Sequence, residues 1–338
     1  MPLRYAYNTN GCTNHRLKDA IELMSEAGYD GIALTLDWHH LDPFARDWER
    51  RAERVKRQLD YHDLGCVIET GARYLLSSRE KHEPTLINPT EMGRRKRVDF
   101  LKRALDIGAL LEVETVSFWA GVVPPVPPEG GVLPRGEQRI SREQAWIWLR
   151  EGVAELLDHA DEVGCELSLE PEPGMLIETN RQYEELVSSL DETGEHLRLA
   201  LDLGHVWVVP PSPPKGSDAS SLMKMNNFPG ASKGGVLPPK GGMTWEEVDK
   251  LIAPAAEVYR YANRLGTVSI EGMDRGVHFH RPLHEGDMPI PPLIEALQAV
   301  EYDRLVCVEL SRESPRAHLA IPESIAFLKK TEQVLAAQ

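Results

Sequence analysis

Residues 268–287 read VSIEGMDRGVHFHRPLHEGD and place three histidines, His278, His280 and His284, within seven positions. Imidazole nitrogens at this density can bind a metal ion or a substrate, and they also occur on solvated surface loops. His278 and His280 alternate, so they share one side of the chain if this segment is extended. The spacing alone leaves the three interpretations open, and the partners elsewhere in the chain must decide among them.

Three carboxylates stand at the ends of mostly apolar runs: Glu170 ends LSLE, Asp202 ends LALD and Glu309 ends CVE. An ionised carboxylate in such a place is costly unless it is paired or bound to a cation. Any one of them alone is more simply explained as a helix cap or a partner of an arginine. Together with histidines such as His205, the three favour a divalent cation held by mixed oxygen and nitrogen ligands.

Short β-like runs alternate with helical segments along the whole chain, which is typical of a parallel sheet with crossover helices. The expected strands are residues 4–10, 31–37, 66–71, 115–120, 166–172, 197–205, 267–271 and 305–310. The expected helices lie near residues 15–27, 44–62, 90–109, 141–163, 179–194, 244–263, 291–300 and 319–336. Eight such units predict one α/β domain over residues 1–338, a single closed (β/α)8 TIM barrel. An open doubly wound sheet is the alternative, but no glycine-rich dinucleotide motif follows any strand.

Two connections, residues 120–141 and 209–243, are long and rich in proline and glycine, and they follow the predicted fourth and sixth strands. Long loops in compact domains are commonly lids, binding loops or disordered segments. The second loop carries Met223, Met225 and Phe228, which provide apolar surface for packing. We therefore interpret the insertion at about 209–243 as a lid that covers a substrate.

The carboxyl ends of barrel strands meet at one mouth, so the polar residues at these ends are candidates for a shared site. We assign six of them to substrate binding: His205, Glu172, Arg73, Trp119, His278 and Arg312. Glu172 also suits a polar turn in EPEPG, and surface salt bridges are the ordinary use of arginine.

The formal net charge of −15 and the pI of about 5.3 argue against nucleic-acid or anionic-membrane partners, which require a basic surface. The N-terminal sequence lacks the apolar segment of a signal peptide, and no apolar run approaches the roughly 20 residues that span a bilayer. The sequence therefore predicts a cytoplasmic protein, and it leaves a homo-oligomer possible.

Four motifs, LEPEPG, LDLGH, EGMDRGVHFHRPLHEGD and VELSRES, occur in this order at the spacing of barrel strands. Their succession resembles the sugar phosphate isomerase/epimerase group of the xylose isomerase-like TIM barrel superfamily. The likeness extends to GYDGIALTLDWHHLDPF and IETGARYLLSSREKHEPT, so it covers nearly the whole chain. The resemblance implies a carbohydrate substrate and a catalytic divalent ion, Mn, Mg, Co or Zn. It implies metal ligands at Glu170, Asp202 and Glu309, with His205 on the substrate side.

The seventh strand departs from this pattern. Members of the group usually read HIED where this chain reads SIEG, so Ser269 stands in place of the expected histidine ligand. Related barrels of the endonuclease IV type place an Asp-x-His pair of zinc ligands where this chain has His278 and His280. We predict that His280 supplies the missing nitrogen, because it precedes Arg281 and lies near the HEGD turn. The predicted metal site is then Glu170, Asp202, His280 and Glu309, and its weakening or loss is the alternative.

The resemblance implies an isomerase or epimerase that removes a proton next to a carbonyl through a metal-stabilised enediolate, with Glu170 and Glu309 as the acid and base. A metal-dependent lyase or dehydratase acting on keto-glycosides or inososes is the first alternative, because the long loops admit a bulky substrate. An endonuclease IV-like phosphoesterase and a catalytically decayed barrel are the remaining ones.

Overall fold

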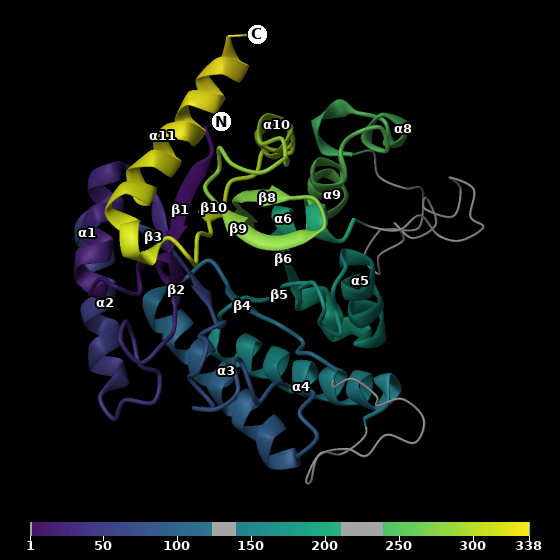
Figure 1. Ribbon diagram of the computed structural model, residues 1–338. Helices are drawn as coiled ribbons and strands as arrows, with labels where there is room; N and C mark the ends of the chain where they lie inside the picture. Colours follow the sequence, from purple (N-terminus) through teal and green to yellow (C-terminus); the bar gives the residue numbers. More distant parts are fainter. Residues whose placement is uncertain (1, 124–139, 211–238, 338) are drawn as a thin grey trace.

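The computed structural model describes residues 2–123, 140–210 and 239–337 and shows a closed barrel of parallel strands surrounded by helices (Figure 1). Neighbouring strands pair in chain order, and β1 closes the ring against β10. The predicted closed TIM barrel is therefore confirmed, and the open sheet is excluded. The barrel strands are β1 (Arg4–Asn8), β2 (Gly31–Thr35), β3 (Gly65–Glu69), β4 (Val116–Phe118), β5 (Leu167–Leu169), β6 (Arg198–Asp202), β7 (Leu265–Ile270) and β10 (Leu305–Val308).

Helices follow the strands on the outside of the barrel, and short 3₁₀ turns join several of them (Figure 1). The α-helices are α1 (Leu17–Ala27), α2 (Trp48–His62), α3 (Glu91–Leu111), α4 (Arg142–Val163), α5 (Asn180–Ser189), α6 (Leu203–Val208), α8 (Trp245–Val248), α9 (Ala253–Tyr261), α10 (Pro291–Ala299) and α11 (Ala317–Ala336). The 3₁₀ turns are η1 (Thr9–Cys12), η2 (Asp191–His196), η3 (Lys240–Gly242) and η4 (Ser314–Arg316).

Local signals set the helix ends. Thr90 and Ser141 precede α3 and α4, and their hydroxyl oxygens accept hydrogen bonds from the backbone N–H groups of Gly93 and Gln144. Gly164 ends α4 with a φ of 69°, a left-handed conformation that glycine adopts without strain. These caps fix where each helix leaves and re-enters the sheet.

The main hydrophobic core lies between the strands and the outer helices. A second, small cluster comes from four barrel strands and consists of Ala6, Ala33, Val67, Leu305 and Cys307. Side chains of this size fill the narrow inside of the barrel, as is usual for the fold. A ligand must therefore bind at a mouth of the barrel and not within it.

The sixth strand ends earlier than predicted. Residues 197–205 were expected to form one strand, but β6 stops at Asp202 and α6 begins at Leu203. The Asp202 carboxylate caps this helix by accepting a 2.7 Å hydrogen bond from the backbone N–H of His205. The turn carries His205 back over the end of the barrel instead of away from it.

Two predicted helices are interrupted. The segment at 244–263 contains α8 and α9, because Pro254 lies in the first turn of α9 and cannot continue a preceding helix. The segment at 179–194 ends its α-helix at Ser189 and continues as the 3₁₀ turn η2.

A hairpin that the sequence analysis did not assign follows β7. Its strands, β8 (Gly272–Asp274) and β9 (Val277–Arg281), are antiparallel and join through Gly276, whose φ is 72°. The hairpin packs on α6 and lies over the end of the barrel (Figure 1). It carries His278 and His280 to the mouth.

Most of the two predicted long loops falls at 124–139 and 211–238, outside the described residues, so the lid interpretation stays a prediction. Within the described part of the chain, no helix is long and apolar enough to cross a membrane.

Candidate active site

A cavity of about 400 Å³ opens at the carboxyl ends of the barrel strands. It is lined by nine of the ten residues that the sequence analysis assigned to the site: Arg73, Trp119, Glu170, Glu172, His205, His278, His280, Glu309 and Arg312. The tenth, Asp202, is buried directly beneath and contacts His205. Strand ends that are far apart in the sequence therefore meet in one place, while the roles of the individual residues stay predictions.

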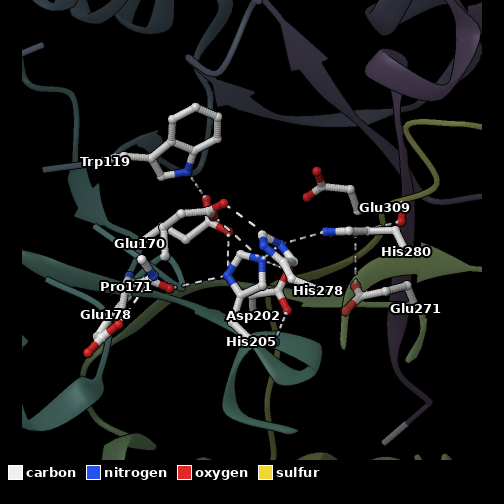
Figure 2. Close-up of polar contacts among 12 residues, drawn as sticks. Trp119, Glu170, Pro171, Glu178, Asp202, His205, Glu271, His278, His280 and Glu309 are labelled. Carbon is white, nitrogen blue, oxygen red and sulfur yellow. Dashed lines mark hydrogen bonds and ion pairs between the residues drawn. The ribbon is translucent and has the colours of Figure 1, made fainter. Parts of the chain in front are cut away.

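Glu170 follows β5 and is almost fully buried in the cavity wall. Its Oε2 accepts a 2.8 Å hydrogen bond from the indole N–H of Trp119, and its Oε1 lies 3.5 Å from Nδ1 of His205 (Figure 2). Burial and the nearby carboxylates of Glu309 and Glu172 raise the pKa of Glu170 well above its usual value. The Glu170 carboxyl group therefore binds a proton more readily than a solvent-exposed glutamate does.

Glu309 follows β10 and enters the cavity from another side, since β6 and β7 separate its strand from β5. The side-chain amide of Asn10, in η1, donates a 3.0 Å hydrogen bond to Oε1 of Glu309. Burial raises the pKa of Glu309, and the neighbouring His280 partly offsets this effect. The two carboxylates influence each other electrostatically, so they share one low-dielectric space.

His205 is a neutral imidazole with a defined orientation. Its Nδ1 faces the carbonyl oxygen of Pro171 at 3.2 Å, and because a carbonyl only accepts, Nδ1 carries the proton. Burial lowers the pKa of His205 to about 4. The lone pair of Nε2 therefore points into the cavity, where it is available to a metal ion or a donor.

The three ring nitrogens Nε2 of His205, His278 and His280 converge (Figure 2). The nitrogen of His278 lies 3.0 Å from that of His205 and 3.4 Å from that of His280. Nδ1 of His280 faces the backbone carbonyl of Glu309 at 3.2 Å, so Nε2 of His280 is also the unprotonated nitrogen. The extended strand β9 points both of its histidines toward α6, so they line the cavity, while the choice between metal binding and substrate binding stays a prediction.

Glu271 belongs to the site but was missed in the sequence analysis. It follows β7 directly, has no exposed surface, and neither of its carboxylate oxygens has a hydrogen-bond partner. Its Oε2 lies 3.9 Å from Nδ1 of His280. The sequence signal was present, because Glu271 ends the apolar run TVSIE as Glu170 and Asp202 end theirs.

Glu69, at the end of β3, is a further buried carboxylate of the cavity. Its Oε1 accepts a hydrogen bond from the backbone N–H of Gly71, while Oε2 has no hydrogen-bond partner. Burial and the charge of Glu309 raise the pKa of Glu69 to about 7. Like the other acids of the cavity, Glu69 can carry a negative charge. It belongs to none of the groups of described side chains that could hold a metal ion.

Side chains that line the cavity or are buried next to it fit a divalent cation. Three overlapping groups, each with ligand atoms within 4.8 Å of one another, are Glu170–Asp202–His205, Asp202–Glu271–His280 and His205–His278–His280. Oδ2 of Asp202 and both oxygens of Glu271 are buried without a hydrogen-bond partner. Such oxygens are costly in a folded protein unless a proton or a cation satisfies them. The donor set of carboxylates and imidazoles suits Mn, Co or Zn and, at its oxygen-rich side, Mg.

A fourth group, Asp37, His39 and His40, lies after β2 at the edge of the cavity. Here Asp37 Oδ1 accepts hydrogen bonds from the backbone N–H groups of His39 and His40, and the His40 ring contacts the carbonyl of His15 at 3.2 Å. These local bonds account for the turn without a metal ion.

The rim of the cavity is cationic and aromatic. Arg73, Lys81 and Arg312 line it, and none of them forms an ion pair with a carboxylate in the described parts of the chain. The guanidinium of Arg312 lies 4.2 Å from the ring centre of Phe279, and Arg73 donates to the carbonyl of Ser311 at 3.3 Å. The rim therefore offers positive charge above a floor of carboxylates.

Comparisons with known proteins agree with this architecture. Residues 21–331 match the sequence model described as a xylose isomerase-like TIM barrel. No curated protein matches the sequence. Among solved structures, a D-tagatose 3-epimerase-like protein is 15% identical with a TM-score of 0.66, and the match covers 99% of both chains. A 3-keto-D-glucoside 4-epimerase from E. coli is 14% identical with a TM-score of 0.65, covering 97% of this chain and 100% of that one. An IolI protein with a bound zinc atom is 16% identical with a TM-score of 0.61, covering 97% and 98%. At these identities the likeness shows a shared fold.

Proposed function

This chain belongs to the xylose isomerase-like TIM barrel family, and we propose that it is a divalent-metal-dependent epimerase or isomerase of sugars or keto-sugars. The reaction would remove a proton from a carbon next to a carbonyl and return a proton to the opposite face or to the neighbouring carbon. Support comes from the carboxylates of the cavity and from solved neighbours whose descriptions name two sugar epimerases.

The observation that carries the proposal is the arrangement of Glu170 and Glu309. Each lines the cavity, each follows a different strand, and each has one carboxylate oxygen held by a hydrogen bond. Trp119 holds Oε2 of Glu170, and Asn10 holds Oε1 of Glu309. The remaining oxygens are available to take a proton from one face of a substrate and to give one to another. This is the arrangement that a two-base proton transfer requires.

A divalent cation, when bound, would supply positive charge that stabilises negative charge developing on the substrate oxygens. Asp202 and His280 would hold it together with Glu170 and Glu309, and Trp119 and His205 would fix the orientation of the groups around it. His205 would also accept a hydrogen bond from a substrate hydroxyl at Nε2. Its protonated Nδ1 is held by Pro171, so the ring would not act as a mobile acid.

The rim residues would select and orient the distal part of the substrate. Arg73 and Arg312 would donate hydrogen bonds to hydroxyl or anionic groups, while Phe279 would contact a sugar ring. Glu172, 3.5 Å from Nε2 of His205 and 3.7 Å from Nε2 of His278, would accept hydrogen bonds from substrate hydroxyls. These roles place recognition at the rim and proton transfer at the floor.

A lyase acting on keto-glycosides is the second candidate, because the same proton removal followed by loss of a β-substituent gives elimination. The cavity of about 400 Å³ favours it, since this volume leaves room beyond one sugar ring. The phosphoesterase alternative has less support, because the formal net charge of −15 does not attract a nucleic acid.

The experiment that tests the proposal is product analysis by NMR with a panel of ketoses and 3-keto-glucosides in the presence of Mn²⁺. An epimerised or isomerised product supports the proposal, and an unsaturated product with release of the aglycone favours the lyase. The matched controls are Glu170→Gln and Glu309→Gln, each of which should abolish turnover. Turnover that persists in both variants, or a panel on which the metal-loaded protein is inert, would overturn the assignment.

A further inference from the structure

Glu271 is a fully buried acid that lies beside a second buried acid, Asp202. The side chain is fully buried, and both oxygens lack a hydrogen-bond partner. Burial, together with the charges of Asp202 and Glu309, raises the pKa of Glu271 well above its usual value. An acid in such a place is normally replaced by an apolar residue unless something binds to it.

Its surroundings are those of a cation site. One oxygen of Glu271, one of Asp202 and one ring nitrogen of His280 all lie within 4.8 Å of one another. Oδ2 of Asp202 is a third buried oxygen without a hydrogen-bond partner in this space. Three buried acceptor oxygens at the ends of two strands lie beside the His280 ring, whose Nδ1 is 3.9 Å from Oε2 of Glu271. Carboxylate oxygens grouped in this way can bind a divalent cation.

The backbone of α6 leaves room for the Glu271 carboxylate because residue 204 is a glycine. A Cβ placed on Gly204, in α6, would lie 1.8 Å from Oε1 of Glu271. Any other residue at Gly204 would displace the Glu271 side chain from Asp202 and His280. The start of α6, which Asp202 caps, thus places both the Asp202 carboxylate and Gly204 beside Glu271.

Ser269 lies two residues before Glu271 on β7, so the two side chains point to the same face of the strand. Ser269 pairs in register with Asp202 and Cys307. It therefore lies one layer lower in the barrel than Glu271. Of these two residues, Glu271 carries a carboxylate, a stronger ligand for a divalent cation than a serine hydroxyl.

We propose that Glu271 is the metal ligand contributed by β7, which makes the centre a carboxylate-rich one built on Asp202, Glu271 and His280. The proposal rests on the metal dependence of the function proposed above. It extends the predicted ligand set of Glu170, Asp202, His280 and Glu309 by one residue and gives the site an additional negative charge. A centre so rich in oxygen ligands favours Mn²⁺ or Mg²⁺ relative to Zn²⁺.

The test is isothermal titration calorimetry of Mn²⁺ into the full chain after treatment with a chelator. Glu271→Gln keeps the shape of the side chain and removes its charge. We expect it to weaken Mn²⁺ binding by at least about a hundredfold, since even residues that merely orient ligands contribute 10- to 100-fold. The matched control is Glu69→Gln, which removes a buried negative charge from the same cavity outside the cluster and should weaken binding at least about tenfold less. Ser269→Ala should leave the affinity unchanged.

Gly204→Ala provides a second variant that keeps every charge. It should displace the Glu271 carboxylate and weaken Mn²⁺ binding in the same direction as Glu271→Gln, with a far-ultraviolet circular dichroism spectrum like that of the wild type. If Glu271→Gln does not fold, Gly204→Ala decides the question. Equal affinity in Glu271→Gln and wild type, or equal losses in Glu271→Gln and Glu69→Gln, would overturn the assignment of Glu271.

The two proposals fail in different ways. Equal Mn²⁺ affinity in the wild type and Glu271→Gln refutes Glu271 as a ligand and leaves the epimerase proposal standing. A wild-type protein that binds neither Mn²⁺ nor Mg²⁺ refutes both the ligand and the metal dependence. A protein that binds Mn²⁺ through Glu271 but converts no sugar refutes the proposed function alone.

Discussion

The indole N–H of Trp119 donates a 2.8 Å hydrogen bond to Oε2 of Glu170, which joins the ends of the neighbouring strands β4 and β5 inside the cavity. The bond fixes one oxygen of Glu170 and thereby the direction in which the other one points. The His82 ring packs edge-on against Trp119, with ring centres 4.9 Å apart, and holds the indole in turn. Trp119 is thus a positioning residue for a carboxylate that we assign to proton transfer.

Replacing Trp119 by phenylalanine removes this donor and keeps most of the packing. We expect kcat to fall by about 10- to 100-fold, as for other residues that orient a reacting group, while KM changes little. Steady-state kinetics on the substrate found in the NMR panel measure both constants. Trp148→Phe is the matched control, because Trp148 stacks on Arg94 away from the cavity and should leave kcat intact. An unchanged kcat in Trp119→Phe would show that Glu170 needs no such support.

The rim arginines should affect binding more than chemistry. Arg312→Ala removes the guanidinium that stacks on Phe279, and we expect KM to rise while kcat stays within about threefold of the wild type. Arg57→Ala is a suitable control, since Arg57 lies on α2 and pairs with Glu53 at the surface. A fall in kcat without a change in KM would instead place Arg312 in the chemical step.

Removal of the metal should destabilise the fold. Glu170, Asp202 and Glu271 are buried, and Glu309 lines the same cavity as Glu170. A cation bound only by the folded state adds a stability of RT ln(1 + [metal]/Kd), which is about 2.7 kcal/mol at a hundredfold excess over Kd. We therefore expect differential scanning fluorimetry to show a higher Tm with Mn²⁺ than with a chelator. The difference should shrink in Glu271→Gln. A Tm that is the same with and without metal would argue against the centre.

A separate pH dependence should arise from Glu184, which lies outside the cavity and accepts a 2.7 Å hydrogen bond from the hydroxyl of Tyr261. Burial raises the pKa of Glu184 from 4.5 to about 7 in the folded state. Between these values the folded state holds a proton that the unfolded state has lost, so the free energy of unfolding falls as the pH rises through this range. This contribution is fully present below pH 4.5 and is lost as the pH passes 7.

Urea unfolding at several pH values measures the effect of Glu184. Glu184→Gln keeps an acceptor for Tyr261 and removes the titrating group, so the loss of stability between about pH 5 and 8 should be smaller in this variant than in the wild type. Identical pH profiles for the two proteins would contradict the raised pKa.

The sequence was sufficient to predict the barrel because each strand is a short apolar run with a helix after it, and the same rule brought nine of the ten assigned residues to one cavity. It could not show that Asp202 ends β6, since an aspartate after LAL suits both a strand end and a helix cap. Nor could it show the hairpin, because VHFHR is equally compatible with a loop until Gly276 closes the turn. Glu271 was within reach of the sequence, but its lack of partners is a property of packing alone.

The central claim is that Glu170 and Glu309 move a proton on the carbon next to a carbonyl. Turnover in D₂O, followed by ¹H NMR and mass spectrometry of the product, tests this claim most directly. The account predicts one solvent deuterium in every product molecule formed by the metal-loaded enzyme, at that carbon after epimerisation or at the neighbouring carbon after isomerisation. It predicts no labelled product from Glu170→Gln or Glu309→Gln. Product that forms without deuterium would mean that hydrogen moves within the substrate without exchanging with the solvent, and it would contradict the assignment of these two carboxylates.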